Sequence, residues 1–180
     1  DFDLQSAMRA GLVKSLVLDR RKEIGALPLE FKAERDESGN PTLSEGQRVM
    51  LRAGLKKLRK LEADFAKIDP NRHPKMLVVC EDTGVSPKVA EFLRDQEGLK
   101  YDGDLNDEIL LIDSGKKAEL GEKDWAPVRE RLFSVDSHAT PRVIVSVLML
   151  REGFDVNNIC VIVPLRSSQA QILLEQTIGR

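Results

Sequence analysis

The sequence is poor in aromatic residues and in cysteine, and neither sign of charge prevails. Aromatic residues make up 4% of the 180 positions, which argues against binding of single-stranded nucleic acid on stacked aromatic side chains. The 28 basic and 30 acidic residues give a formal net charge of −2. This balance excludes the uniformly basic surface of histone-like or ribosomal proteins, but it leaves room for a local basic strip. The length predicts about one domain.

Long apolar runs and clusters of metal ligands are also missing from the sequence. No run approaches the roughly 20 apolar residues that span a bilayer, and no stretch has the pattern of a signal peptide. Cys80 and Cys160 each lie in an apolar run without a second ligand at metal-binding spacing. We therefore expect buried thiols, no metal site, no membrane partner and a cytoplasmic location. His73 and His138 are isolated, and we expect surface or packing roles for them.

The clearest predicted helix lies in the first half of the chain. Ser44 and Gln47 have the spacing of a capping box, and the pattern ends before Asp69. Between them, apolar residues recur at helical spacing: Leu51, Leu55, Leu58, Leu61 and Phe65. Residues 29–35 alternate like a half-exposed strand, and residues 36–41 have the composition of a turn. We expect residues 1–70 to form a linker and accessory helical segment.

Continuous apolar runs alternate with helical patterns after residue 70. Such runs are typical of strands buried on both faces, and they cover residues 76–80, 109–112, 143–147 and 159–163. Ser86 is predicted to cap the helix that follows the first run, and residues 125–132 and 168–180 also have helical patterns. Pro164 is expected to end the last strand. The pattern predicts an α/β fold with a parallel sheet and helices on both faces.

Ligands of such sheets bind beyond the carboxyl ends of the strands, where Glu81 and Asp82 follow the first apolar run. A Walker B strand ends in a similar way, but the phosphate loop it needs is missing from the sequence. At Gly115, the nearest match, neither the first Gly nor the final Ser or Thr of that loop is in place. A phosphorylated receiver domain would need a Lys after its last strand, where this chain has Pro164. Solvated carboxylates are the favoured interpretation of Glu81 and Asp82.

A row of basic residues follows one side of the predicted long helix. The four are spaced by four positions and are Arg48, Arg52, Lys56 and Lys60. Contact with the phosphate backbone of a nucleic acid needs such charge and no base-specific geometry. The solvated side of an amphipathic helix has the same pattern, so both interpretations stay open.

The last forty residues carry two motifs in a characteristic order. One buried strand runs into LREGFD at residues 150–155, and the next is followed by QTIGR at residues 176–180. This order resembles the second RecA-like motor domain of superfamily 2 helicases and translocases, in which LREGFD is similar to motif V and QTIGR to the start of motif VI. Residues 77–93 resemble motif IV and its helix. The stretch from residue 145 onward is most similar to the restriction (Res) subunit of type III restriction–modification enzymes.

The resemblance implies roles for particular residues. Arg180 would be the first arginine of motif VI and the catalytic residue of this domain, reaching the γ-phosphate as an arginine finger. It would also bind ATP together with Gly153, Asp155, Gln176 and Gly179. The nucleic acid backbone would lie near Ser146, and the basic row would add Arg48, Arg52, Lys56 and Lys60. The second arginine of motif VI would fall three residues past Arg180.

The resemblance also implies the setting of the chain. We expect a fragment of an ATP-dependent DNA translocase and restriction endonuclease, with residues 71–180 forming a RecA-like helicase C-terminal domain that is cut within motif VI. ATP and Mg²⁺ would be held mostly by a preceding first motor domain, and the partners would be double-stranded DNA and a methyltransferase subunit. The isolated chain is expected to be inactive.

Two alternatives remain at this point. Another superfamily 2 DNA or RNA helicase is the first, because LREGxD also occurs in the excision-repair helicase subunit. A non-catalytic nucleotide-binding or interaction module is the second, in which Arg180 could be replaced freely.

Overall fold

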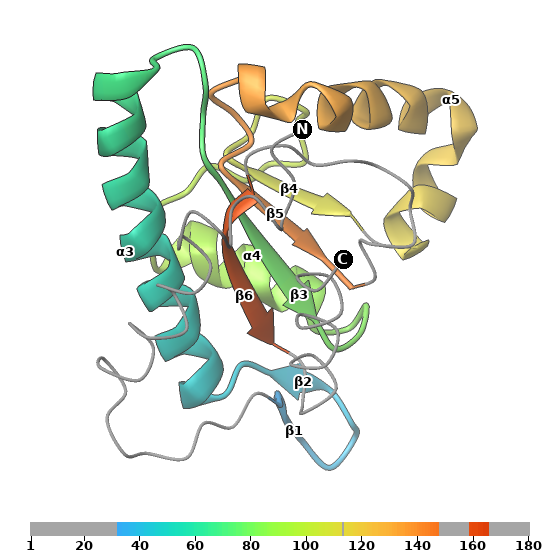
Figure 1. Cartoon of the computed structure of the whole chain (residues 1–180). Coiled ribbons are helices and arrows are strands. Elements are labelled where there is room, and N and C mark those ends of the chain that lie inside the picture. The colour runs from blue at the N-terminus through green and yellow to red at the C-terminus, as the bar shows by residue number, and fades with distance from the viewer. Residues whose placement is uncertain (1–31, 113, 148–158, 166–180) are drawn as a thin grey trace, which may run out of the picture.

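A four-stranded parallel sheet forms the centre of the computed structural model, which describes residues 32–112, 114–147 and 159–165. The strands lie in the order β4-β5-β3-β6, and every neighbouring pair is parallel (Figure 1). Their bounds are β3 Lys75–Cys80, β4 Ile109–Ile112, β5 Val143–Ser146 and β6 Ile159–Leu165. The four predicted strands are therefore confirmed.

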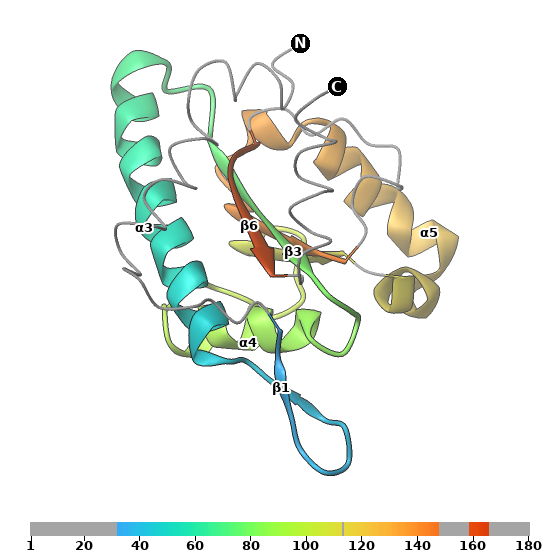
Figure 2. The ribbon, with the colours of Figure 1, turned by 60° about the horizontal axis from the view of Figure 1, so that its bottom comes forward.

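Helices cover both faces of this sheet. Helices α3 (Glu45–Ile68) and α4 (Ser86–Asp95) share one apolar cluster with the sheet, and α5 (Ser114–Phe133) shares a second cluster with the opposite face (Figure 2). A short 3-10 helix, η1 (Val135–Ser137), follows α5, and a small antiparallel hairpin of β1 (Glu34–Arg35) and β2 (Pro41–Thr42) precedes α3. The α/β prediction with helices on both faces is confirmed.

Strand β3 shows why the strand sequences are apolar without a break. Met76 and Val78 belong to the cluster under α3 and α4, whereas Leu77 between them belongs to the cluster under α5. Successive side chains of a strand point to opposite faces, so a sheet covered on both faces needs apolar residues at every position.

Helix α3 begins and ends where the sequence predicts. Ser44 and Gln47 form the capping box in both directions, and Asp69 is the C-cap. The predicted leucine row is buried against the sheet, with Phe65 partly buried beside it. The domain boundary expected at residue 70 stays a prediction. Helix α3 lies before this residue and packs in the same core as the sheet.

Two local predictions are corrected by the structure. Val85, not Ser86, is the N-cap of α4, and Ser86 is its buried first residue. The turn before the helix is held by Asp82, which accepts hydrogen bonds from the amides of Gly84 and Val85. Pro164 does not end β6, which continues to Leu165. A proline is tolerated there because β6 is the outermost strand of the sheet among the described residues, so no ladder bond from its nitrogen is needed.

Two further elements differ from the predicted ranges. Of the strand expected over residues 29–35, residues 29–31 lie outside the described part of the chain, residues 32 and 33 are not in a strand, and β1 covers Glu34–Arg35. The helix expected over residues 125–132 is part of the longer α5, which changes direction at Gly121, where φ is +75°. No helix in the described part of the chain is both long and apolar enough to cross a bilayer.

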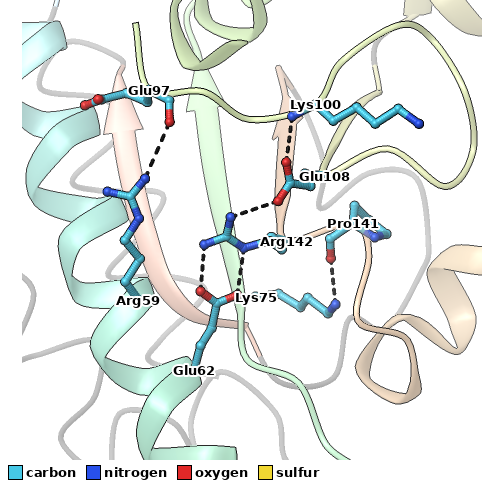
Figure 3. Close-up of polar contacts among 8 residues, drawn as sticks. All are labelled: Arg59, Glu62, Lys75, Glu97, Lys100, Glu108, Pro141 and Arg142. Carbon is cyan, nitrogen blue, oxygen red and sulfur yellow. Dashed lines mark hydrogen bonds and ion pairs between the residues drawn. The ribbon is translucent and has the colours of Figure 1, made fainter.

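Ion pairs fasten the sheet at the amino ends of its strands. Arg142, just before β5, binds both carboxylate oxygens of Glu62 on α3 at 2.7 and 2.8 Å and also contacts Glu108 before β4 at 3.1 Å (Figure 3). The pKa of Arg142 is raised, mainly by its hydrogen bonds to Glu62. Because Arg142 is about four-fifths buried, this bidentate arrangement joins α3 to two strands in a fixed geometry.

A buried lysine lies in the same region. Lys75 begins β3 and is fully buried, and its Nζ donates to the carbonyl oxygens of His138 and Pro141 at 2.6 Å each. Burial lowers the pKa of Lys75 to about 8, an effect that Glu62 and Asp136 oppose and nearby arginines reinforce. The ammonium group therefore holds the loop before β5 in place. Its removal from water disfavours the charged form of the side chain.

Gly54 generates a prediction about packing, because a Cβ at this position would lie 2.5 Å from Cγ2 of Val163 on β6. Helix propensity alone would make Gly54→Ala stabilising by about 1 kcal/mol. We expect the reverse, a loss of about 1–2 kcal/mol in the free energy of unfolding, because the inserted methyl group overpacks the core. Chemical denaturation measures it. Ala63→Gly on the exposed side of α3 is the control and should cost about 1 kcal/mol; a stabilised Gly54→Ala variant would contradict the observed packing.

Lys75 generates a prediction about pH. Between pH 8 and 10.5 the folded chain has released the Lys75 proton while the unfolded chain still holds it, so the contribution of this residue to stability rises with pH. The difference in unfolding free energy between wild type and Lys75→Met should shift in favour of wild type by about 3 kcal/mol across this window. Denaturation at several pH values measures the difference. Cys160 titrates in both proteins, so its contribution cancels when the two are compared. A flat or falling difference would refute the buried ammonium group.

Candidate functional site

The carboxyl edge of the sheet carries the polar residues that the sequence analysis singled out. Glu81 and Asp82 follow β3, and Ser146 is the last residue of β5. Ser146 is 2% exposed and lies beside Val79 of β3 and Ile112 of β4. Adjacent strands therefore bring these three candidate residues to one edge.

Glu81 and Asp82 bind the backbone and side chains of this chain. Oε1 of Glu81 accepts a hydrogen bond from the amide of Ala33 at 2.8 Å. Oδ1 of Asp82 accepts from Gly84 and Val85 at 2.9 and 3.0 Å, and Oδ2 pairs with Arg35 of β1. The two carboxylates thus fasten the β1–β2 hairpin to the end of β3 and organise the start of α4. Sequence reasoning identified the carboxylates but missed Arg35, since nothing local marks a partner 47 residues away.

Hydrogen bonds to Asp36 close the turn of the β1–β2 hairpin. Asp36 accepts backbone hydrogen bonds from Ser38 and Asn40 and a side-chain bond from Asn40, and Gly39 adopts a φ of +81°. Hydrogen bonds from Asn40 lower the pKa of Asp36. This turn confirms the one predicted over residues 36–41, and it projects beyond the carboxyl edge of the sheet, as Figure 2 shows.

The residues with roles implied for ATP lie outside the described part of the chain. They are Gly153, Asp155, Gln176, Gly179 and Arg180. The strands that lead to them are described: β5 ends at Ser146 and β6 at Leu165, and both strands pair with β3. The two strands that precede LREGFD and QTIGR in the sequence therefore end at the same edge of the sheet, one on each side of β3.

The basic row lies along the side of α3 away from the sheet. Arg48 binds Glu45 and the carbonyl of Leu43, and Arg52 pairs with Glu97 at 3.4 Å. The guanidinium of Arg52 also lies 5.2 Å from the centre of the Phe92 ring. These contacts within the chain hold the first two members in place.

Lys56 and Lys60 continue the row toward the end of α3 and are exposed. Arg59 lies next to them and reaches the carbonyl of Glu97 after α4 at 3.5 Å (Figure 3). The four residues of the row, here called the basic strip, thus include two that are paired with Glu45 and Glu97 of this chain. Binding of nucleic acid to the strip stays a prediction.

The described part of the chain has no cluster of metal ligands, and its two cysteines are buried. Its residues include no group of three or more His, Cys, Asp or Glu side chains that could hold a metal ion. Cys80 and Cys160 are buried free thiols, as predicted, and burial raises the pKa of Cys160 to about 11. A thiol with so high a pKa is inert at neutral pH.

Comparison with known proteins relates the chain to restriction enzymes. It is 32% identical over 113 residues to the type I restriction enzyme EcoKI endonuclease subunit of Escherichia coli strain K12. The match covers 63% of this chain and 9% of that subunit, so the chain spans about a tenth of the relative. No family model and no solved structure matches the chain. The similarity supports a restriction-enzyme relation, and the type III class and the motor activity remain predictions.

Proposed function

We propose that this chain belongs to the DNA-translocating motor of a restriction enzyme subunit and forms most of its second RecA-like domain. The observation that carries the proposal is the topology of the sheet. Two motifs far apart in the sequence follow β5 and β6, and these two strands flank β3 in a parallel sheet. Ligands of such sheets bind at the carboxyl edge, where both motif segments begin.

The motif residues suit a nucleotide phosphate chemically. Gly153 would allow the backbone to approach a ligand closely, because glycine has no Cβ. Asp155 would hold a ribose hydroxyl or orient a cationic side chain. Arg180 would stabilise the charge that develops on the γ-phosphate during hydrolysis. Mg²⁺ and the remaining ATP contacts would come from a first motor domain of the parent protein.

The class of restriction enzyme is a separate question. The motif resemblance favours type III, whereas the curated relative is a type I subunit. Cleavage of DNA and a methyltransferase partner would belong to the whole protein. The proposal for this chain concerns the motor, which is tested independently of the class.

Replacing the proposed arginine finger tests the motor directly. Arg180→Ala in the full-length parent should lower DNA-stimulated ATP hydrolysis on the order of 10³-fold, because a finger contributes mainly to the transition state. Steady-state phosphate release measures the rate, and titration with a fluorescent ATP analogue checks that binding is kept.

Arg94→Ala is the matched control for this experiment. Arg94 is an exposed arginine on α4 that pairs with its neighbour Asp95, and its replacement should leave hydrolysis unchanged. An unchanged rate in Arg180→Ala would contradict the motor and favour a binding module.

The basic strip on α3 generates a second prediction. If Lys56 and Lys60 contact phosphates, Lys56→Gln/Lys60→Gln should reduce the slope of log K against log salt for duplex DNA by about 2, because each phosphate contact contributes about 0.9. Fluorescence anisotropy on the parent at several salt concentrations measures the slope. Lys88→Gln/Lys123→Gln, on α4 and α5, is the control with the same loss of charge. Equal slopes in both double variants would identify the strip as a solvated helix surface.

A further inference from the structure

A cavity of about 190 Å³ lies beside β4, away from the carboxyl edge of the sheet. Its walls are the loop of residues 101–105, strand β4 and helix α5. Three consecutive β4 residues, Ile109, Leu110 and Leu111, line it. Because successive side chains of a strand point to opposite faces, a cavity that touches three in a row opens at the edge of the strand.

This edge is the end of the sheet in the described part of the chain, since β4 is the outermost strand on that side. Figure 1 shows α5 alongside β4 with no further described strand beyond it. The amide of Ile109 already donates to the carbonyl of Lys100 at 3.3 Å, so the part of the outer edge beyond Ile109 offers backbone groups to an extended segment.

The lining of the cavity is divided between apolar and acidic groups. Ile109 and Trp125 are 1% and 3% exposed and form its inner wall. Asp104 and Asp124 are exposed and lie at its mouth. None of the described lining residues is basic. A matching occupant has an apolar group inside and positive charge at the entrance.

The volume decides which occupants fit. Pockets for cofactors and drug-sized ligands measure about 300–1,000 Å³, so a nucleotide is too large for this one. An apolar cavity of about 150 Å³ holds a benzene ring. The cavity therefore accommodates a single apolar side chain of phenyl or isobutyl size.

The walls are held in place before anything binds. Asp107 is 1% exposed, and its Oδ2 accepts hydrogen bonds from the amides of Asp102 and Asp104 at 2.7 and 2.9 Å. Arg131 of α5 donates to Oδ1 of Asn106 at 2.8 Å and so fastens the loop to the helix. A preformed cavity avoids the entropic cost of ordering its walls on binding.

We propose that this cavity is a docking site for an extended segment of a partner polypeptide. One apolar side chain of the segment enters the cavity, and basic side chains beside it pair with Asp104 and Asp124. Side chains two residues apart on an extended segment point the same way, so the motif is basic–x–apolar–x–basic. A buried anchor side chain in a well-packed pocket is the usual form of an interface hot spot. The site is separate from the proposed motor site, and either can fail without the other.

Trp125 is the single tryptophan of the chain and lines the cavity, so its fluorescence reports on this site alone. The probe is the peptide acetyl-Arg-Thr-Phe-Thr-Arg-amide, added to the 180-residue chain with excitation of tryptophan. We expect a saturable change in emission. Replacing Phe by Ala in the peptide should weaken binding at least about tenfold, because the buried ring is lost. Replacing both Arg by citrulline, a neutral isostere, should weaken it about fivefold.

Protein variants complete the test. Asp104→Asn/Asp124→Asn keeps the side-chain oxygen at position 104 that accepts from Asn106 and should bind the Arg and citrulline peptides equally. Val128→Phe fills the cavity and should abolish the response, with circular dichroism confirming the fold. The proposal is overturned if the Phe peptide gives no saturable change, if the Ala peptide binds equally well, or if the double Asn variant still distinguishes Arg from citrulline. Phenethylammonium binding as tightly as the peptide would also overturn it, in favour of a small organic cation.

Discussion

Strand β3 is the element on which the other described elements depend. It pairs with β5 on one edge and β6 on the other, and its side chains enter the apolar clusters on both faces of the sheet. Beyond Lys75, whose ammonium group is hydrogen-bonded, the strand is apolar, because an unpartnered polar side chain would be buried on either face. The long α3 is held against the same sheet by Gly54, which allows the helix to approach β6 closely. Chemistry is therefore confined to the ends of the strands.

The two ends of the sheet are built differently. At the amino end, Arg142 and Lys75 make dense contacts with Glu62, Glu108 and two carbonyl groups. Such a network is costly to break, because a buried charge would lose its partner. At the carboxyl end, Glu81 and Asp82 fasten only a short hairpin and the start of α4. The buried charged contacts are gathered at one end of the sheet, and the strands that precede the two motifs end at the other.

Local signals in the sequence predicted the fold well. The capping box at Ser44 and the apolar runs of the strands depend on residues near each other in the chain, and each is confirmed. The errors arose where the folded chain, and not the nearby sequence, decides the local structure. The backbone of α4 starts one residue earlier than the cap signal of Ser86 indicates, and Pro164 is tolerated because of where β6 lies in the sheet. Sequence reasoning could not find the Arg142 network or the cavity beside β4, because both join residues whose proximity only the fold creates. The candidate ATP residues lie outside the described ranges and stay predictions.

Hydrogen–deuterium exchange on the full-length parent, with and without a non-hydrolysable ATP analogue, tests the central claim most directly. The claim is that the segments after β5 and β6 form one nucleotide site across β3. We predict that residues 147–158 and 166–180 gain protection together on addition of the analogue, while residues 99–107 beside the cavity do not change. Protection of neither segment, or of one without the other, would contradict the account.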